Sequence, residues 1–459
     1  MVRLYLKMGK SYLYLIVTLL MFVISNVHSQ NYEPDSIGKA WFPDAKFGIF
    51  VHWVIDYFPK NNLSDVSTNY PKYWKEANVA SSKFTASNYN PVIWAKQFKS
   101  CGAKYVVLTT KHHVGFALYD YKGANFTAKN NSPAKRDLLT DYVKAMRNEG
   151  LKVGFYFSLP DWMHPDYLTL KTSNNGKEVD WQKSDFVRWK KFTDEMLAEI
   201  RHLCTAYGKI DLFWFDGDWE RSAEMWRSKE IADTIYKYQP HAVINNRLRS
   251  SEIGDYSTPE MIVPLKAPDK GWTELCTTLG YNWAGTDSEK DLKNPSELVR
   301  IFGDMLTIGG NTLLNVSPDQ TGEISSNQFE KINLLGNWIR LNSEAVYGSR
   351  AGLPWGLFNG GSTRKGSTIY LIAYETSPNE LVVKGIEGEI ERITHLSTGT
   401  ELKFRTMSDY HSDNGRKGWR FITLPKELIE PFGTVLKITF KNKKVSIKSP
   451  EGDTINWEN

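Results

Sequence analysis

Cysteine is scarce in this sequence, whose 459 residues contain three: Cys101, Cys204 and Cys276. Three cysteines cannot form a complete disulfide framework, and none has the Cys-x-x-Cys spacing of a structural zinc site. These facts exclude a disulfide-rich scaffold and a zinc-finger type of protein. In an exported chain, so few cysteines favour a bacterial envelope protein over a disulfide-rich eukaryotic ectodomain.

Long hydrophobic runs are also missing, except for one between Tyr12 and Val27. It follows a basic start and ends in Val27-His28-Ser29, small or neutral residues that typically precede a cleavage site. A membrane anchor is the alternative, but the run is shorter than the roughly 20 residues of a membrane span. We therefore predict that residues 1–29 are a cleaved signal peptide. The mature protein is expected to be secreted or periplasmic, without membrane insertion.

Strong net charge is absent once this leader is considered separately. The whole chain carries a formal charge of +5, but residues 1–29 hold three cations and no acid, which leaves +2 for the rest. No basic stripe marks a nucleic-acid interface, so we expect no nucleic-acid partner. Bulk charge likewise gives no reason to expect an acidic partner.

Short apolar runs alternate with amphipathic stretches from about residue 40 to 350. The runs are β-branched and aromatic with little alternation, which is typical of strands buried on both faces. The expected strands are Phe47–Trp53, Tyr105–Thr110, Lys152–Ser158, Ile210–Asp216, Ala242–Asn245 and Thr312–Val316. The expected helices are Pro91–Cys101, Asp137–Glu149, Phe186–Ala206, Ala223–Tyr238 and Gln328–Leu341.

This alternation favours an α/β fold of the (β/α)8-like TIM-barrel type over residues 30–351. An open doubly wound sheet is the alternative, but no Gly-rich phosphate loop follows the first strand. After residue 351 the helical patterns fade, and short strand-like runs recur between Gly, Asn and Pro. This pattern predicts a C-terminal antiparallel β-sandwich over 352–459. Its expected strands are Thr368–Tyr374, Glu380–Val383, Ile390–Leu396, Trp419–Leu424 and Val435–Phe440.

Barrel enzymes carry their reactive groups where strands end, so polar residues at those ends are the candidates. They include no Gly-x-Ser-x-Gly elbow and no His-Glu-x-x-His pair. Several carboxylates are present, and two on one rim can cleave an acetal, one as acid and one as nucleophile or base. Asp216, directly after an apolar strand, is the best nucleophile candidate, although it could instead cap a turn. Glu260 is a weaker candidate, because Thr258-Pro259-Glu260 could be a turn with an exposed acid.

The pair His112-His113 leaves three alternatives open: hydrogen bonds to sugar hydroxyls, metal binding, or a packed core histidine. Adjacent strand residues point to opposite faces, which disfavours a shared metal unless the strand has ended. Arg247 could clamp a substrate oxygen, pair with Asp216, or do both. Aromatic residues make up 13% of the chain, which suits either a sugar pocket or a large core.

Seven segments between residues 41 and 324 together resemble the α-L-fucosidases of glycoside hydrolase family 29. They read, in chain order, WFPDAKFGIFVHW, GAKYVVLTTKHHVGF, GLKVGFYFSLPDWMHPDY, IDLFWFDGDW, NNR, DYSTPE and GGNTLLNVSPDQTGEI. The resemblance implies a (β/α)-type barrel with a C-terminal β-sandwich. It also implies hydrolysis of terminal α-linked L-fucose with retention, through a covalent intermediate, with no metal and no cofactor.

The resemblance assigns roles to individual residues of this sequence. Asp216 is the implied nucleophile and Glu260 the implied acid/base. The implied sugar-binding residues are His52, Trp53, His112, His113, Tyr156, Trp214 and Arg247. The implied partner is a fucosylated oligosaccharide or polysaccharide.

Four departures from the family pattern fall among these motifs. Val54 replaces the Gly of His-Trp-Gly, and Val114 replaces the Asp of Lys-His-His-Asp. A Glu-Trp-Tyr segment appears as Lys72-Tyr73-Trp74, and a Ser-Trp-Gly-Tyr segment as Asn282-Trp283-Ala284-Gly285. Loss of the Asp beside His113 removes an expected orienting partner for an imidazole. These changes predict an altered pocket, so a galactose-like or modified sugar, or a binding protein without turnover, are alternatives to fucose release.

Overall fold

The computed structural model describes residues 36–59, 69–167, 186–285, 287–374, 379–407, 418–442, 444–450 and 452–458. The predicted signal peptide, residues 1–29, lies outside these ranges. Within them, no helix combines the length and the apolar character needed to cross a bilayer.

Eight parallel strands form one sheet, with the spatial order β5-β4-β3-β2-β1-β8-β7-β6. A bridge between Asn245 and Tyr256 joins the two edges, so the sheet closes into the predicted barrel. The strands are β1 Phe47–Val51, β2 Tyr105–Lys111, β3 Lys152–Ser158, β4 Leu212–Asp216, β5 Val243–Ile244, β6 Tyr256–Ser257, β7 Trp272–Thr278 and β8 Asn311–Val316. The sequence pattern indicated six of them and missed β6 and β7. In β7 the buried acid Glu274 and several threonines hide the apolar signal.

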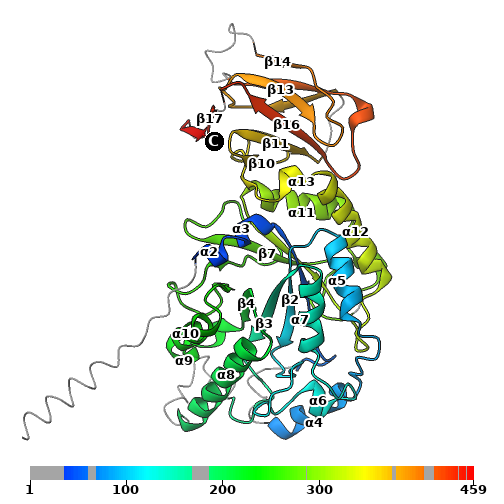
Figure 1. Cartoon of the computed structure of the whole chain (residues 1–459), viewed down its shortest axis with the longest axis vertical. Coiled ribbons are helices and arrows are strands. Elements are labelled where there is room, and N and C mark those ends of the chain that lie inside the picture. The colour runs from blue at the N-terminus through cyan, green and yellow to red at the C-terminus, as the bar shows by residue number, and fades with distance from the viewer. Residues whose placement is uncertain are drawn as a thin grey trace, which may run out of the picture.

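Helices surround the barrel and connect its strands (Figure 1). They are α2 Ser36–Lys39, α3 Phe42–Ala45, α4 Tyr70–Ser81, α5 Pro91–Ser100, α6 Ala128–Asn131, α7 Leu139–Asn148, α8 Phe186–Ala206, α9 Ala223–Trp226, α10 Ser228–Tyr238, α11 Pro295–Thr307, α12 Ser326–Leu341 and α13 Ser343–Val346. The helix expected over Ala223–Tyr238 is two helices, because Arg227 takes a left-handed conformation (φ 56°) between them. The sequence analysis missed α11, although Asn294 caps it through the backbone N–H of Glu297.

The barrel strands present alternate residues to its interior and to the surrounding helices. On β4, Leu212 and Trp214 belong to the cluster inside the barrel, whereas Phe213 and Phe215 belong to the cluster beneath the helices. Side chains along a strand alternate between its two faces. Asp216, the last residue of β4, therefore continues the inward series.

The C-terminal region is antiparallel, as predicted. One sheet has the order β13-β16-β11-β10-β9, a second β12-β15-β14, and β17 pairs with β18. The strands are β9 Arg350–Ala351, β10 Gly361–Lys365, β11 Thr368–Ala373, β12 Asn379–Val383, β13 Ile390–His395, β14 Phe404–Thr406, β15 Arg420–Leu424, β16 Thr434–Phe440, β17 Lys444–Lys448 and β18 Thr454–Glu458. Leu371 and Ile438 of the first sheet share a core with Leu381 and Ile422 of the second, which gives a sandwich.

The sandwich lies against one end of the barrel, next to α11, α12 and α13 (Figure 1). Trp338 of α12 donates from Nε1 to the carbonyl of Gly433 at 2.7 Å, and the backbone N–H of Ser362 donates to Oγ1 of Thr307 at 2.8 Å. Helices α4 and α6 lie at the other end (Figure 1). The sandwich therefore covers the end of the barrel where strands begin, and leaves the other end open.

Candidate active site

A cavity of about 970 Å³ opens at the carboxyl end of the barrel strands. Its described lining runs from Phe50 to Gln320, so no described residue of the sandwich reaches it. The lining includes eight of the nine residues that sequence analysis singled out: His52, His112, His113, Tyr156, Trp214, Asp216, Arg247 and Glu260. Residues from six separate strand ends thus meet in one hollow.

Asp216 lies at the inner end of this cavity, on a sharp turn. Gly217 follows it with φ 82°, a left-handed conformation that favours glycine. A Cβ at position 217 would lie 2.2 Å from Cδ of Pro160, so the turn has no room for a side chain. The strand end and this crowded turn hold the carboxylate in place, and its side chain is 13% exposed.

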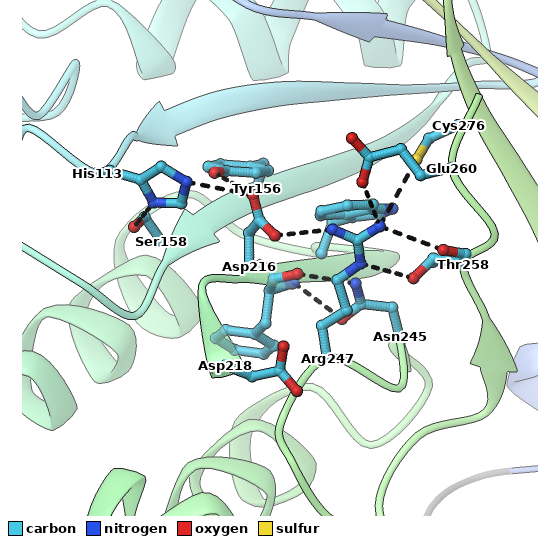
Figure 2. Close-up of polar contacts among 12 residues, drawn as sticks. His113, Tyr156, Ser158, Asp216, Asp218, Asn245, Arg247, Thr258, Glu260 and Cys276 are labelled. Carbon is cyan, nitrogen blue, oxygen red and sulfur yellow. Dashed lines mark hydrogen bonds and ion pairs between the residues drawn. The ribbon is translucent and has the colours of Figure 1, made fainter. Parts of the chain in front are cut away.

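Both oxygens of Asp216 accept hydrogen bonds (Figure 2). The hydroxyl of Tyr156 donates to Oδ2 at 2.9 Å, and the guanidinium of Arg247 donates to Oδ1 at 2.8 Å. Nε2 of His113 lies 3.6 Å from Oδ2. The carboxylate is thus paired with a cation and fixed in orientation.

Arg247 connects this carboxylate to a second one. A terminal nitrogen of its guanidinium donates to Oε2 of Glu260 at 2.8 Å, and Nε donates to Oγ1 of Thr258 at 2.9 Å. The guanidinium also lies over the ring of Trp214, 4.6 Å from its centroid. Burial disfavours the charged form of Arg247, but the charges of Asp216 and Glu260 outweigh burial and raise its pKa above the ordinary value.

Glu260 is held by backbone pairing with β7. The N–H of Met261 donates to the carbonyl of Cys276 at 2.9 Å, and the N–H of Cys276 donates to the carbonyl of Pro259 at 3.1 Å. The Glu260 side chain is 42% exposed, against 13% for Asp216. One carboxylate therefore lies deep in the cavity and the other near its mouth, with one cation between them.

Two histidines at the inner end present a hydrogen-bond acceptor to the cavity. Nδ2 of Asn315 donates to the carbonyl of Trp283 at 2.8 Å, so its Oδ1 is the acceptor for Nδ1 of His52 at 2.6 Å. The hydroxyl of Ser158 donates to the carbonyl of Pro160 at 2.7 Å and therefore accepts from Nδ1 of His113 at 2.6 Å. Since Nδ1 carries the proton in each imidazole, Nε2 is free to accept from a hydroxyl.

Burial keeps these imidazoles neutral. The cost of charging them away from water, together with the nearby imidazoles and, for His113, Arg247, lowers the pKa of His52, His112 and His113 to about 3 each. Neutral imidazoles both donate and accept, which suits neutral hydroxyl groups better than anions. Ser158 also orients His113, in place of the Asp that Val114 replaces.

Trp53 is the one predicted sugar ligand that the structure does not bring into the cavity. The alternation that turns His52 inward turns the next residue outward. The fully buried indole packs on Phe84, Tyr89 and Trp94, with ring centroids 4.8–5.4 Å apart. Trp53 is therefore a core residue behind the cavity wall and not one of the residues that line the cavity.

The departures from the family pattern do reach the cavity. Val54 and Val114 both line it. So do Lys72 and Tyr73 of one altered segment and all four residues 282–285 of the other. The changes therefore alter the walls of the cavity, while its deepest polar groups keep the expected residue types.

Sequence reasoning missed Glu274, which lies under the cavity floor. Its side chain is fully buried and accepts from Nε1 of Trp214 at 3.1 Å and from the hydroxyl of Tyr105. Burial raises its pKa to about 7, although both hydrogen bonds favour the anion. Glu274 fixes the ring on which Arg247 rests. No local signal marked it, because Glu274 and the threonines of β7 hide the apolar pattern of that strand.

Metal ligands do not gather in the described part of the chain: no group of three or more His, Cys, Asp or Glu side chains there could hold an ion. The three cysteines are buried and unpaired with one another. In the cavity, the arrangement of side chains provides two carboxylates, neutral imidazoles and aromatic rings. These are the groups that glycoside hydrolysis by paired carboxylates uses.

Comparison with known proteins agrees with this chemistry. The family described as Alpha-L-fucosidase matches residues 21–344. The chain belongs to the alpha-L-fucosidase family. It is 33% identical to tissue alpha-L-fucosidase of Bos taurus over 80% of this chain and 81% of that protein, and 31% identical to the Homo sapiens enzyme over 84% and 85%. Membership makes the chain a glycoside hydrolase.

Solved structures of the family share the whole architecture. Alpha-L-fucosidase isoenzyme 1 from Paenibacillus thiaminolyticus is 31% identical, with a TM-score of 0.76 over 88% of this chain and 99% of that chain. An alpha-L-fucosidase of glycoside hydrolase family 29 from Bacteroides thetaiotaomicron is 25% identical, with a TM-score of 0.75 over 90% and 96%. The barrel and the sandwich both belong to the shared fold.

The buried acid beneath the floor gives a prediction about stability. An unfolded glutamate titrates near pH 4.5 and folded Glu274 near pH 7, so the folded chain binds more protons between these values. The stability that protonated Glu274 contributes is present below about pH 4.5 and is lost as pH rises through 7. Glu274→Gln cannot lose that proton. Its free energy of unfolding, relative to wild type, should increase by up to about 3 kcal/mol from pH 4.5 to 7.5.

Urea unfolding of both proteins at the two pH values measures this difference. The titration of the histidines is common to both proteins and cancels. An equal difference at both pH values would contradict the assignment.

Proposed function

We propose that this chain is an exo-acting, retaining α-L-fucosidase that releases terminal α-linked L-fucose from glycans or polysaccharides. Asp216 is the nucleophile and Glu260 the acid/base. The observation that carries the proposal is the pair of 2.8 Å hydrogen bonds by which Arg247 joins both carboxylates in one cavity. Because both carboxylates bind the same guanidinium, they lie close together. One anomeric carbon can then be within reach of both.

The depth of the two carboxylates fits a terminal sugar. A sugar at the inner end would place its anomeric carbon over Asp216, while the leaving group faces the mouth, where Glu260 is half-exposed. Acceptor nitrogens of His52 and His113 would bind its hydroxyls. Trp214, whose ring carries Arg247 and stacks on Tyr156 at 5.6 Å, would line the inner end of the sugar site.

The reaction then proceeds in two displacements. In the first, an oxygen of Asp216 attacks the anomeric carbon, the glycosidic C–O bond breaks, and Glu260 gives its proton to the leaving oxygen. In the second, Glu260 takes a proton from water, the water oxygen attacks the same carbon, and the bond to Asp216 breaks. Two inversions retain the configuration. A family member from Bacteroides thetaiotaomicron was trapped as a covalent intermediate with 2-fluoro-fucosyl fluoride, which supports this route.

A related enzyme for a galactose-like or modified sugar is the second candidate. The observation that favours it is the position of Val54 and Val114 in the cavity wall. In this candidate Asp216 and Glu260 keep their roles, and the altered cavity wall selects a sugar with a different substituent. The predicted signal peptide adds secretion or export to the periplasm to either candidate.

Removing the nucleophile is the first test. Asp216→Ala should lower kcat on an aryl α-L-fucoside by about 10³-fold or more, because the covalent route is lost. Steady-state kinetics with a panel of aryl fucosides and galactosides measure it and separate the two candidates by the sugar that wild type prefers. Activity of the variant near the wild-type value would remove Asp216 from this role.

Removing the acid/base should give a different pattern. Glu260→Ala should lose about 10²–10⁴-fold on substrates with poor leaving groups and much less on activated ones. Added azide should restore turnover and yield the azide of retained configuration, since it attacks the intermediate on Asp216. NMR of the product identifies the anomer. An azide product of inverted configuration would instead make Glu260 the nucleophile.

A further inference from the structure

The cavity has an outer part that the proposed reaction does not use. Three aromatic side chains line it, namely Phe58, Trp162 and Trp219, and we call them the outer aromatic wall. The rings of Phe58 and Trp162 lie 5.0 Å apart, edge to face. His113 lies 5.1 Å from Trp162 and 6.0 Å from Trp219. The wall is therefore continuous with the inner end of the cavity, where the nucleophile lies.

Trp219 is exposed to an unusual degree for its position. Its side chain is 54% exposed, more than any other tryptophan in the described ranges. Large apolar surface left open inside a cavity indicates a ligand that covers it. Of the hydroxyl-binding groups at the inner end, His113 contacts the Trp219 ring, and more than half of the Trp219 surface stays open.

The segment that carries Trp219 is anchored by hydrogen bonds at Asp218. Trp219 is the third residue after Asp216 and belongs to η3, Asp218–Glu220. The N–H of Arg249 donates to Oδ2 of Asp218 at 3.1 Å, and Nε1 of Trp226 donates to the carbonyl of Asp218 at 3.0 Å. A backbone segment held in place before the ligand arrives lowers the ordering cost of binding.

A carboxylate stands beside the wall. Oε1 of Glu220 accepts from Nε1 of Trp162 at 3.3 Å, and Oε2 accepts from the hydroxyl of Tyr167. Each oxygen has a second lone pair for a hydroxyl donor. An aromatic face with an acceptor at its edge matches a pyranose ring, which has an apolar face and hydroxyl groups around its rim.

The charges around this region favour a neutral ligand. Apart from the reacting pair and Arg247, the described lining carries the acids Asp56, Glu76 and Glu220 and the cation Lys72. Sulfate or carboxylate groups on the ligand would face an excess of like charge. The cavity volume of about 970 Å³ is at the upper end of the range for small-molecule sites, which leaves space beyond one monosaccharide.

We propose that the outer aromatic wall is a binding subsite for a second, neutral sugar ring of the glycan that carries the fucose. Trp219 packs on the apolar face of that ring, and Glu220 accepts one of its hydroxyls. This subsite rests on the proposed function. It makes the enzyme select fucosylated oligosaccharides of neutral sugars over small fucosides.

The test compares two substrates of the full-length mature enzyme. α-L-Fucosyl fluoride fills only the fucose position, whereas a neutral fucosylated oligosaccharide also fills the subsite. For Trp219→Ala, the ratio of kcat/KM on the oligosaccharide to kcat/KM on the fluoride should fall about tenfold relative to wild type. Trp219→Phe, which keeps an aromatic ring, should restore most of the ratio.

Each outcome decides a separate point. A ratio within twofold of wild type in Trp219→Ala would overturn the subsite, because fluoride hydrolysis shows that the enzyme is folded and active. Faster hydrolysis of a sulfated oligosaccharide than of its neutral counterpart would overturn the proposed preference for a neutral sugar ring. If wild type hydrolyses neither substrate, the proposed function fails, and the subsite fails with it.

Discussion

The guanidinium of Arg247 is the group around which the catalytic region is organised. It donates to the deep carboxylate of Asp216 and to the outer carboxylate of Glu260, both at 2.8 Å. Charge-assisted hydrogen bonds of this kind are strong and directional. Without the cation, two carboxylates in one cavity would repel each other, so their closeness depends on Arg247.

Several parts of the barrel cooperate to place that cation. Trp214 supports its face, and Glu274 beneath fixes Trp214 through the indole N–H. Thr258, two residues before Glu260, accepts from its Nε. Strands β4 and β7, the turn after β5 and the segment after β6 thus meet at one side chain. The sandwich acts at the opposite end of the barrel and lends no described residue to the cavity.

Much of the fold could be predicted because buried parallel strands leave a plain signal in the sequence. Apolar runs such as Leu212–Phe215 identified six barrel strands, but β7 carries Glu274 and β6 has only two residues. Whether a two-residue segment pairs as a strand, or an acid is buried within one, depends on tertiary contacts that a local sequence pattern does not reveal. The break at Arg227 likewise depends on a single left-handed residue.

The candidate site was largely predictable from residues at strand ends, and its exception has a physical cause. His52 and Trp53 are neighbours in sequence, but strand alternation sends one into the cavity and the other into the core. His112 and His113 both reach the cavity because β2 has ended at Lys111. Sequence patterns did not single out Trp219 and Glu220. The exposure of the Trp219 ring and the hydrogen bonds of Glu220 are properties of the folded chain.

Attack of Asp216 on the sugar leaves a covalent intermediate, and trapping that intermediate is the decisive experiment. The mature enzyme would be incubated with 2-deoxy-2-fluoro-α-L-fucosyl fluoride, digested with protease, and analysed by tandem mass spectrometry. We expect one fluorofucosyl group per chain, on the peptide that contains Asp216 and on that carboxylate. A label on Glu260 or on another residue would contradict this role of Asp216.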